Sequence, residues 1–133
     1  MRFNGKPILF GEVRTEHGKP FQDKNGEYAS LLRIAKPCDN CIADVKERLG
    51  KKPSGFNHSI NHDNKVAFTV VSGSRSLRIC DKTYFSHDDY RNCATFPQDY
   101  DFKDQTPNYV CGMSVPPNMM ANIATEIYKQ WLK

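Results

Sequence analysis

The sequence contains no long apolar segment. None of its hydrophobic runs approaches the roughly 20 residues that a helix needs to cross a bilayer. Met1 and Arg2 open a polar, glycine-containing stretch, where a signal peptide would have an apolar core. We therefore expect a cytoplasmic protein with no membrane partner.

The sequence also lacks a disulfide framework. Its five cysteines are an odd number at irregular spacing: Cys38, Cys41, Cys80, Cys93 and Cys111. The cytosol keeps such thiols reduced, so buried thiols are the expectation. A chain of 133 residues can bury a sizeable core without cross-links, and it corresponds to one domain or part of one.

The net charge of the chain excludes few classes of function. Nineteen lysines and arginines against 15 aspartates and glutamates leave a net charge of +4. This excess is compatible with a phosphate-backbone partner but does not require one. We find no internal repeat and no low-complexity segment.

Residue patterns in the first two thirds of the chain predict one helix and two strands. Residues 1–30 look like loops and short strands. Residues 40–49 have apolar positions at helical spacing, and Gly50 is a natural stop. The β-branched run Val66–Val71 predicts a strand, and Leu77–Ile79 predicts a second one.

The remaining third predicts two helices. Ser86 and Asp89 fit a capping-box-like start for a short helix from His87 to about Ala94. Pro116 and Pro117 open a final helix of about 15 residues. Its apolar stripe consists of Met120, Ile123, Ala124, Ile127 and Trp131. The expected fold is α+β, strand-rich, with a short helix and a C-terminal amphipathic helix.

Three segments, in order, resemble the C-terminal end of DNA (cytosine-5) methyltransferases, especially phage-type ones. Lys65–Gly73 is similar to the target-recognition segment that carries a Thr-Val pair. Phe85–Phe102 is similar to the ninth motif, a short helix that ends in Phe-Pro-x-x-Tyr. Tyr109–Pro117 is similar to the tenth motif, Gly-Asn-Ser-Val-Pro before a helix, although Met113 replaces the commoner Asn. Residues 1–55 match more loosely.

The resemblance implies a target-recognition region over residues 1–84 and a motif nine and ten segment over residues 85–133. It places Thr69 and Val70, with Ser72 beside them, against DNA, where a short hydroxyl would position a phosphate. Without the resemblance, Thr69 would be an ordinary half-buried strand residue.

Basic residues give further candidates for DNA contact. Arg75 and Arg78 follow the Ser72–Ser74 turn, and their guanidinium groups could pair with guanine or with phosphate. Lys51 and Lys52 look like phosphate-neutralising loop lysines. The alternative for all four is an ordinary solvated surface.

The resemblance also implies that four residues form one edge of a cofactor pocket. Gly112, Met113, Ser114 and Val115 would border a pocket for S-adenosylmethionine that is shared with a missing catalytic part. A glycine permits close backbone approach, and Ser114 can bond a carboxylate or a ribose.

Four methyltransferase segments are missing: the Gly-rich cofactor loop, the Pro-Cys nucleophile segment, Glu-Asn-Val and Gln-Arg-x-Arg. We assign no catalytic residue. Cys38 follows a proline, but the negative charge of the neighbouring Asp39 would disfavour a thiolate nucleophile. Cys38-x-x-Cys41 could be half of a zinc site with Cys80, Cys93, His58 or His62, but these form no second tight pair, and we predict no metal.

Two functions from different classes remain open at this point. In the first, the chain is a split subunit or a fragment of a methyltransferase and binds double-stranded DNA together with a catalytic chain, in a phage or restriction-modification setting. In the second, it is a catalytically inactive, stand-alone DNA-binding or regulatory module. A small zinc-binding interaction protein is a third possibility.

Overall fold

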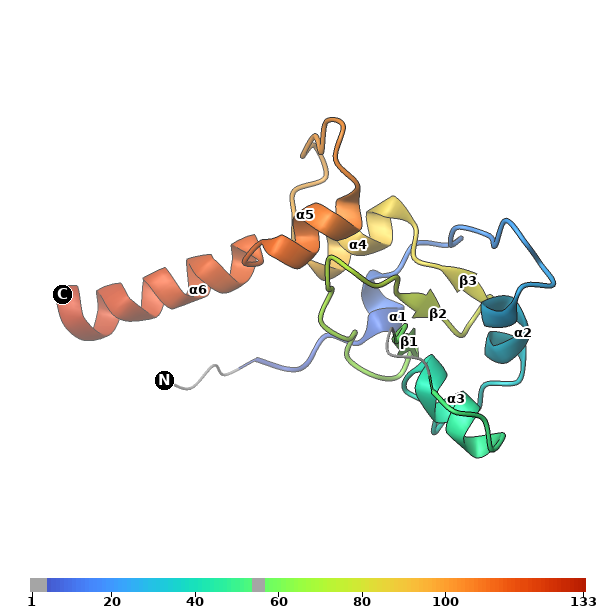
Figure 1. Ribbon diagram of the computed structural model, residues 1–133. Coiled ribbons are helices and arrows are strands. Elements are labelled where there is room, and N and C mark those ends of the chain that lie inside the picture. The colour runs from blue at the N-terminus through green and yellow to red at the C-terminus, as the bar shows by residue number, and fades with distance from the viewer. Residues whose placement is uncertain (1–4, 54–56) are drawn as a thin grey trace.

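A computed structural model describes residues 5–53 and 57–133 and shows an α+β fold (Figure 1). Three two-residue strands lie centrally: β1 (Ile60–Asn61), β2 (Leu77–Arg78) and β3 (Thr83–Tyr84). The helices are α1 (Phe10–Val13), α2 (Glu27–Arg33), α3 (Ile42–Arg48), α4 (His87–Cys93), α5 (Pro107–Met113) and α6 (Pro117–Ile127), and α6 continues into the π-helical turn η1 (Tyr128–Leu132).

The sheet has the order β1-β2-β3. β1 and β2 are parallel, with Ile60 opposite Leu77, whereas β2 and β3 are antiparallel, with Leu77 opposite Tyr84. Helices α2 and α3 lie at one end of the sheet, and α4 and α5 lie at the other (Figure 1).

Two apolar cores correspond to these two ends. The first is built from α1, α4, α5 and the start of the β3–α4 connection, and its buried residues are Phe10, Phe85, Tyr90, Ala94, Phe96 and Cys111. The second is built from α2, α3 and the strands, and its buried residues are Leu31, Leu32, Ile42, Val45, Ile60 and Leu77. Phe10 stacks on Phe85 at 4.9 Å between ring centroids, so packing crosses the predicted boundary between residues 84 and 85.

Two predicted helices are confirmed, and local chemistry explains both. In α4, Asp89 N donates to Ser86 Oγ at 3.0 Å and Ser86 N donates to Asp89 Oδ2 at 2.8 Å, which is a reciprocal capping box. Helix α3 ends just before Gly50, which adopts a left-handed φ of 70° that glycine tolerates without strain. The strand predicted over Leu77–Ile79 is present as β2.

Other expectations hold in part or are wrong. Residues 5–30 consist largely of loops, as predicted, and Lys19 forms an isolated bridge with Tyr84, but α1 and the start of α2 are also present. Residues 1–4 lie outside the described part of the chain.

Val66–Val71 forms no strand. Within the described residues the fold is therefore not strand-rich. A β-branched run needs a neighbouring strand to form a ladder. Here the Phe68 amide instead donates to the side chain of Asn61, at 2.9 Å.

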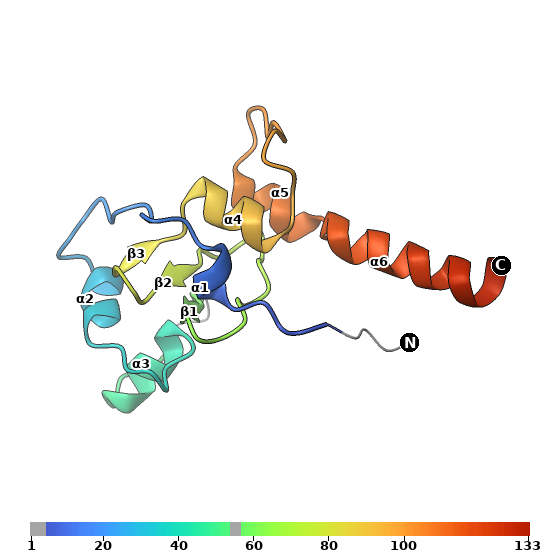
Figure 2. The ribbon, with the colours of Figure 1, turned by 180° about the vertical axis from the view of Figure 1, so that it is seen from behind.

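Helix α6 projects away from the body of the molecule in both views (Figures 1 and 2). None of its residues is buried. The predicted helix and its apolar stripe are present, but no other described part of this chain covers the stripe. No helix in the described ranges has the length and apolar character needed to traverse a membrane.

Candidate functional site

Arg78, predicted to read a DNA base, is completely buried. Its guanidinium pairs with Asp89 at 2.9 Å and with Asp81 at 3.1 Å, and it also donates to the Thr15 carbonyl at 3.0 Å. This prediction is corrected: the group is committed to the interior and does not face a ligand. Arg78 lies in β2, and its side chain points towards α4. The residues next to Arg78 in the sequence do not indicate this orientation.

The segment that contains Thr69, Val70 and Ser72 is held by contacts from distant elements. Asn61 anchors Phe68, and Asn108 Nδ2 of α5 donates to the Ser72 carbonyl at 3.4 Å. Gly112 lies so close that a Cβ there would be 2.3 Å from Ser72 N. Only glycine allows this approach of α5 to the segment.

These contacts bring two predicted sites to one cavity. A hollow of about 450 Å³ is lined by residues of the predicted DNA segment and of the predicted cofactor edge, together with core thiols: Ala67, Phe68, Thr69, Val70, Cys93, Ala94, Cys111, Gly112, Ser114, Pro116 and Met119. Thr69 is exposed at its rim and Val70 is half-buried. Regions that are far apart in the sequence thus share one concave surface.

The four predicted cofactor residues do not by themselves form a binding site for S-adenosylmethionine. The space that Gly112 leaves open is filled by the chain's own Val71–Ser72 backbone. The Ser114 hydroxyl donates to the Val110 carbonyl at 2.6 Å, and Met113 and Val115 are exposed. Gly112 and Met113 are the last two residues of α5.

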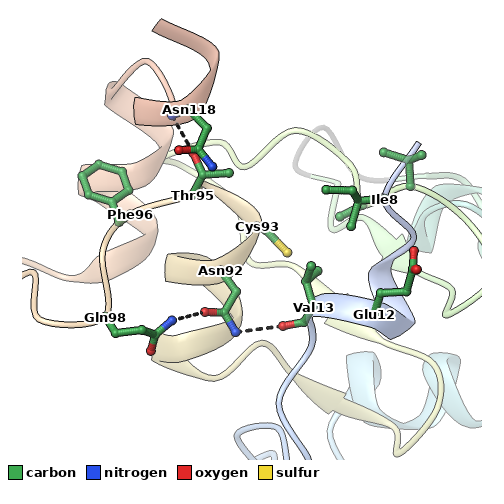
Figure 3. A pocket seen from close by; sticks show the side chains of 11 residues that line it. Ile8, Glu12, Val13, Asn92, Cys93, Thr95, Phe96, Gln98 and Asn118 are labelled. Atoms are coloured by element: carbon green, nitrogen blue, oxygen red, sulfur yellow. Dashed lines mark hydrogen bonds between the residues drawn. The ribbon is translucent and has the colours of Figure 1, made fainter. Parts of the chain in front are cut away.

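A second hollow, of about 680 Å³, adjoins the first and shares Ala67 and Cys93 with it. Figure 3 shows Cys93 facing Ile8 and Val13 across this space, with Asn92, Gln98 and Asn118 at its polar rim. Asn92 Nδ2 donates to the Val13 carbonyl at 2.8 Å. Gln98 Nε2 donates to Asn92 Oδ1 at 2.7 Å and Asn118 N donates to Thr95 Oγ1 at 3.1 Å, as Figure 3 also shows. No local pattern of residues in the sequence predicts this surface.

The two thiols in these hollows are protonated at neutral pH. Burial, together with the neighbouring charge of Asp89, raises the pKa of Cys93 to about 12. Burial raises the pKa of Cys111 to about 11. Since the thiolate is the nucleophilic form, neither group is activated for attack.

The remaining predicted DNA residues lie elsewhere. Arg75 is exposed, and its guanidinium carbon lies 5.1 Å from the centroid of the Tyr84 ring. Lys51 and Lys52 are exposed after α3, at the other end of the molecule from α5 (Figure 1). The seven predicted DNA contacts therefore do not form one continuous face.

The cysteine and histidine side chains considered as zinc ligands do not gather at one point. Within residues 5–53 and 57–133, no three His, Cys, Asp or Glu side chains gather to hold a metal ion. His62 Nε2 instead bonds the Asp39 carbonyl at 2.7 Å, and His58 Nδ1 accepts from Arg75 N at 3.1 Å.

Comparisons with protein-family models, curated proteins and solved structures give no match to this chain.

Proposed function

We propose that this chain is the C-terminal, DNA-recognising and cofactor-pocket-completing part of a DNA (cytosine-5) methyltransferase, and that it works with a partner that carries the catalytic segments. One observation carries the proposal: the Thr69–Ser72 segment packs against Gly112, so the two regions that resemble the recognition segment and the tenth motif border one cavity.

The exposed apolar surface of α6 also supports the proposal of a partner protein. Its exposed apolar side chains include Met119, Met120 and Ile127, and η1 adds Trp131, which is 81% exposed. Exposed apolar surfaces of this kind mark interaction sites. In the proposal, this helix packs against the catalytic part.

The residues of this chain indicate which parts of the reaction it would serve and which the partner would supply. The partner holds S-adenosylmethionine and supplies the nucleophile and the acid, because Gly112–Val115 offer at most an edge. This chain contributes Thr69 and neighbouring groups to position the DNA backbone, a contact that fixes register without reading sequence. The exposed Arg75 remains available to DNA, whereas Arg78 does not.

The test is complementation. A phage-type cytosine-5 methyltransferase from which the recognition region and the last two motifs have been removed is mixed with this chain, duplex DNA and labelled S-adenosylmethionine. We expect label in DNA only when both proteins are present, and loss of this activity in a Met120→Asp, Trp131→Asp variant.

Controls separate the possible roles of the chain. Thr69→Ala should lower complementation while Thr106→Ala, at another exposed threonine, should not. DNA binding without complementation would favour the stand-alone DNA-binding module. Label incorporated by this chain alone and lost in Cys38→Ser would contradict the proposal.

A further inference from the structure

A small cavity between α2 and the β2–β3 turn is lined by three cations. Its volume is about 230 Å³, and Lys24, Arg33 and Lys82 all contribute to its wall. Lys24 precedes α2, Arg33 is in the last turn of α2, and Lys82 is in the turn that ends beside α2 (Figure 1). None of these residues belongs to the three segments that resemble a methyltransferase.

The fold holds the three cations together. An Arg33 Nη2 group donates to the Lys24 carbonyl, which ties the loop to the helix. Lys82 has a φ of 58°, a left-handed conformation that non-glycine residues adopt rarely. This conformation forms part of the tight turn that brings the Lys82 side chain to the cavity.

Their charge is not balanced by carboxylates. Among the described residues, Lys24, Arg33 and Lys82 form no ion pair. Asp81 lines the cavity, but its carboxylate already accepts from Thr83 Oγ1 at 2.7 Å and pairs with Arg78 at 3.1 Å. Burial lowers the pKa of Lys82, which agrees with an ammonium group that lacks a nearby counter-ion.

An aromatic cavity adjoins this cationic one. It has a volume of about 240 Å³, and the two cavities share Pro20, Phe21 and Ala29. Asp23 and Glu27 also line it, and the Glu27 carboxylate pairs with Lys46 at 2.8 Å.

Phe21 lies 4.3 Å from Tyr84 between ring centroids, and Tyr28 and Arg75 line the same space. Phe21, Tyr28 and Tyr84 are half-buried against the second apolar core. Partly exposed aromatic rings beside cations can stack the bases of single-stranded nucleic acids.

We propose that these adjoining cavities bind one nucleotide unit of a single-stranded nucleic acid. Lys24, Arg33 and Lys82 hold the phosphate, and Phe21, with Tyr84 and Arg75, accepts the base. The site lies outside the Thr69–Gly112 cavity and needs neither a catalytic partner nor S-adenosylmethionine. Arg75 is the one residue that it shares with the DNA contacts of the proposed function. The site goes beyond that function and is tested through Lys24, Arg33, Lys82 and Phe21, which the proposed function does not use.

The experiment measures binding of a dye-labelled thymidine oligonucleotide of about 12 nucleotides by fluorescence anisotropy at several salt concentrations. The variant Lys24→Ala, Arg33→Ala, Lys82→Ala is compared with Lys103→Ala, Lys129→Ala, Lys133→Ala. Each triple change lowers the net charge from +4 to +1, since three positive charges are removed. Thermal melting confirms that both variants are folded.

We expect the cavity variant to bind more weakly and its salt dependence to flatten by about 0.7 unit, because the site holds one phosphate and single strands release about 0.7 counter-ion per neutralised phosphate. The control variant should keep the parent slope. Phe21→Leu should weaken binding at an unchanged slope, because it removes a stacking surface and no charge.

Inorganic phosphate distinguishes the source of the anion. Its titration, followed by amide chemical shifts, should perturb Lys24, Arg33 and Lys82 weakly, and the oligonucleotide should compete with it at far lower concentration. Equal potency of the two ligands would overturn the assignment to nucleic acid. So would an unchanged salt slope in the cavity variant, or the absence of oligonucleotide binding by the parent.

Discussion

Arg78 and Asp89 form a charge pair with no solvent exposure on either side chain. The pair connects β2 with α4, and Arg78 also donates to Thr15, so three separate parts of the chain meet there. Asp89 in addition caps α4 through Ser86. Removing one partner of such a pair leaves the other charge buried without compensation.

We predict that Arg78→Ala destabilises the protein by about 3–5 kcal/mol, whereas Arg75→Ala, at an exposed position, changes stability by less than about 0.5 kcal/mol. Urea unfolding followed by circular dichroism measures both. Similar midpoints for the two variants would show that the buried pair does not organise the core.

His58 gives a second prediction at the residue scale. Burial lowers its pKa below the ordinary value of 6.5, and the neighbouring charge of Arg75 lowers it further. Its Nδ1 accepts a hydrogen bond from the Arg75 amide at 3.1 Å, which requires the unprotonated nitrogen. The folded state therefore binds this proton less readily than the unfolded state does.

The stability that depends on neutral His58 is fully present above the unfolded pKa and is lost as pH falls towards the folded pKa. We expect the free energy of unfolding to decrease as pH falls below the ordinary histidine pKa of 6.5, and His58→Asn, which keeps an acceptor near Nδ1, to flatten that decrease. Denaturant titrations at several pH values measure the slope. His17→Asn, at an exposed histidine, serves as the control, and an equal effect of both changes would refute the assignment.

At the scale of elements, the packing of α5 on the Val71–Ser72 backbone depends on Gly112. An added Cβ would lie 2.3 Å from Ser72 N and 2.6 Å from the Val71 carbonyl carbon, and backbone atoms cannot move aside as a flexible side chain can. This contact also shapes the cavity that Thr69 borders.

Gly112→Ala should therefore lower stability by about 1–3 kcal/mol, the range for overpacking of a tight contact. Gly73→Ala is the matched control, because nothing lies within 4 Å of the Cβ position at Gly73. Thermal melting gives the difference, and the amide chemical shifts of Thr69 and Val70, which are not sequence neighbours of either glycine, should move only in the Gly112 variant. Equal melting temperatures would mean that α5 does not depend on this close approach.

At the scale of the whole molecule, α6 and η1 extend from a body that does not cover them (Figure 2). Their exposed apolar residues are Met119, Met120, Ile127, Tyr128, Trp131 and Leu132. An isolated chain with such a surface has a driving force for association. Trp131 is the only tryptophan, so its fluorescence reports on this surface alone.

We predict that the isolated chain self-associates as concentration rises, that its tryptophan emission shifts to shorter wavelength in parallel, and that Met120→Asp suppresses both effects. Removing residues 118–133 should leave the melting temperature of the body nearly unchanged, because no residue of α6 is buried. Sedimentation and fluorescence measure these outcomes. A monodisperse monomer with a solvent-shielded Trp131 at low concentration would contradict the prediction.

The sequence by itself determined the elements whose causes act within a few residues. Ser86 and Asp89 specify the start of α4, Gly50 terminates α3, and Pro117 begins α6, because capping bonds, a left-handed φ and a fixed proline φ are local effects.

The tertiary structure decided everything that depends on a distant partner. Val66–Val71 has strand-forming residues but finds no strand to pair with, and Arg78 has the sequence context of a surface arginine but meets Asp89, 11 residues later, in the interior. Lys24, Arg33 and Lys82 converge only because the β2–β3 turn packs beside α2. Burial and charge pairing depend on which segments become neighbours, and that outcome follows from packing of the whole chain, not from any short pattern of residues.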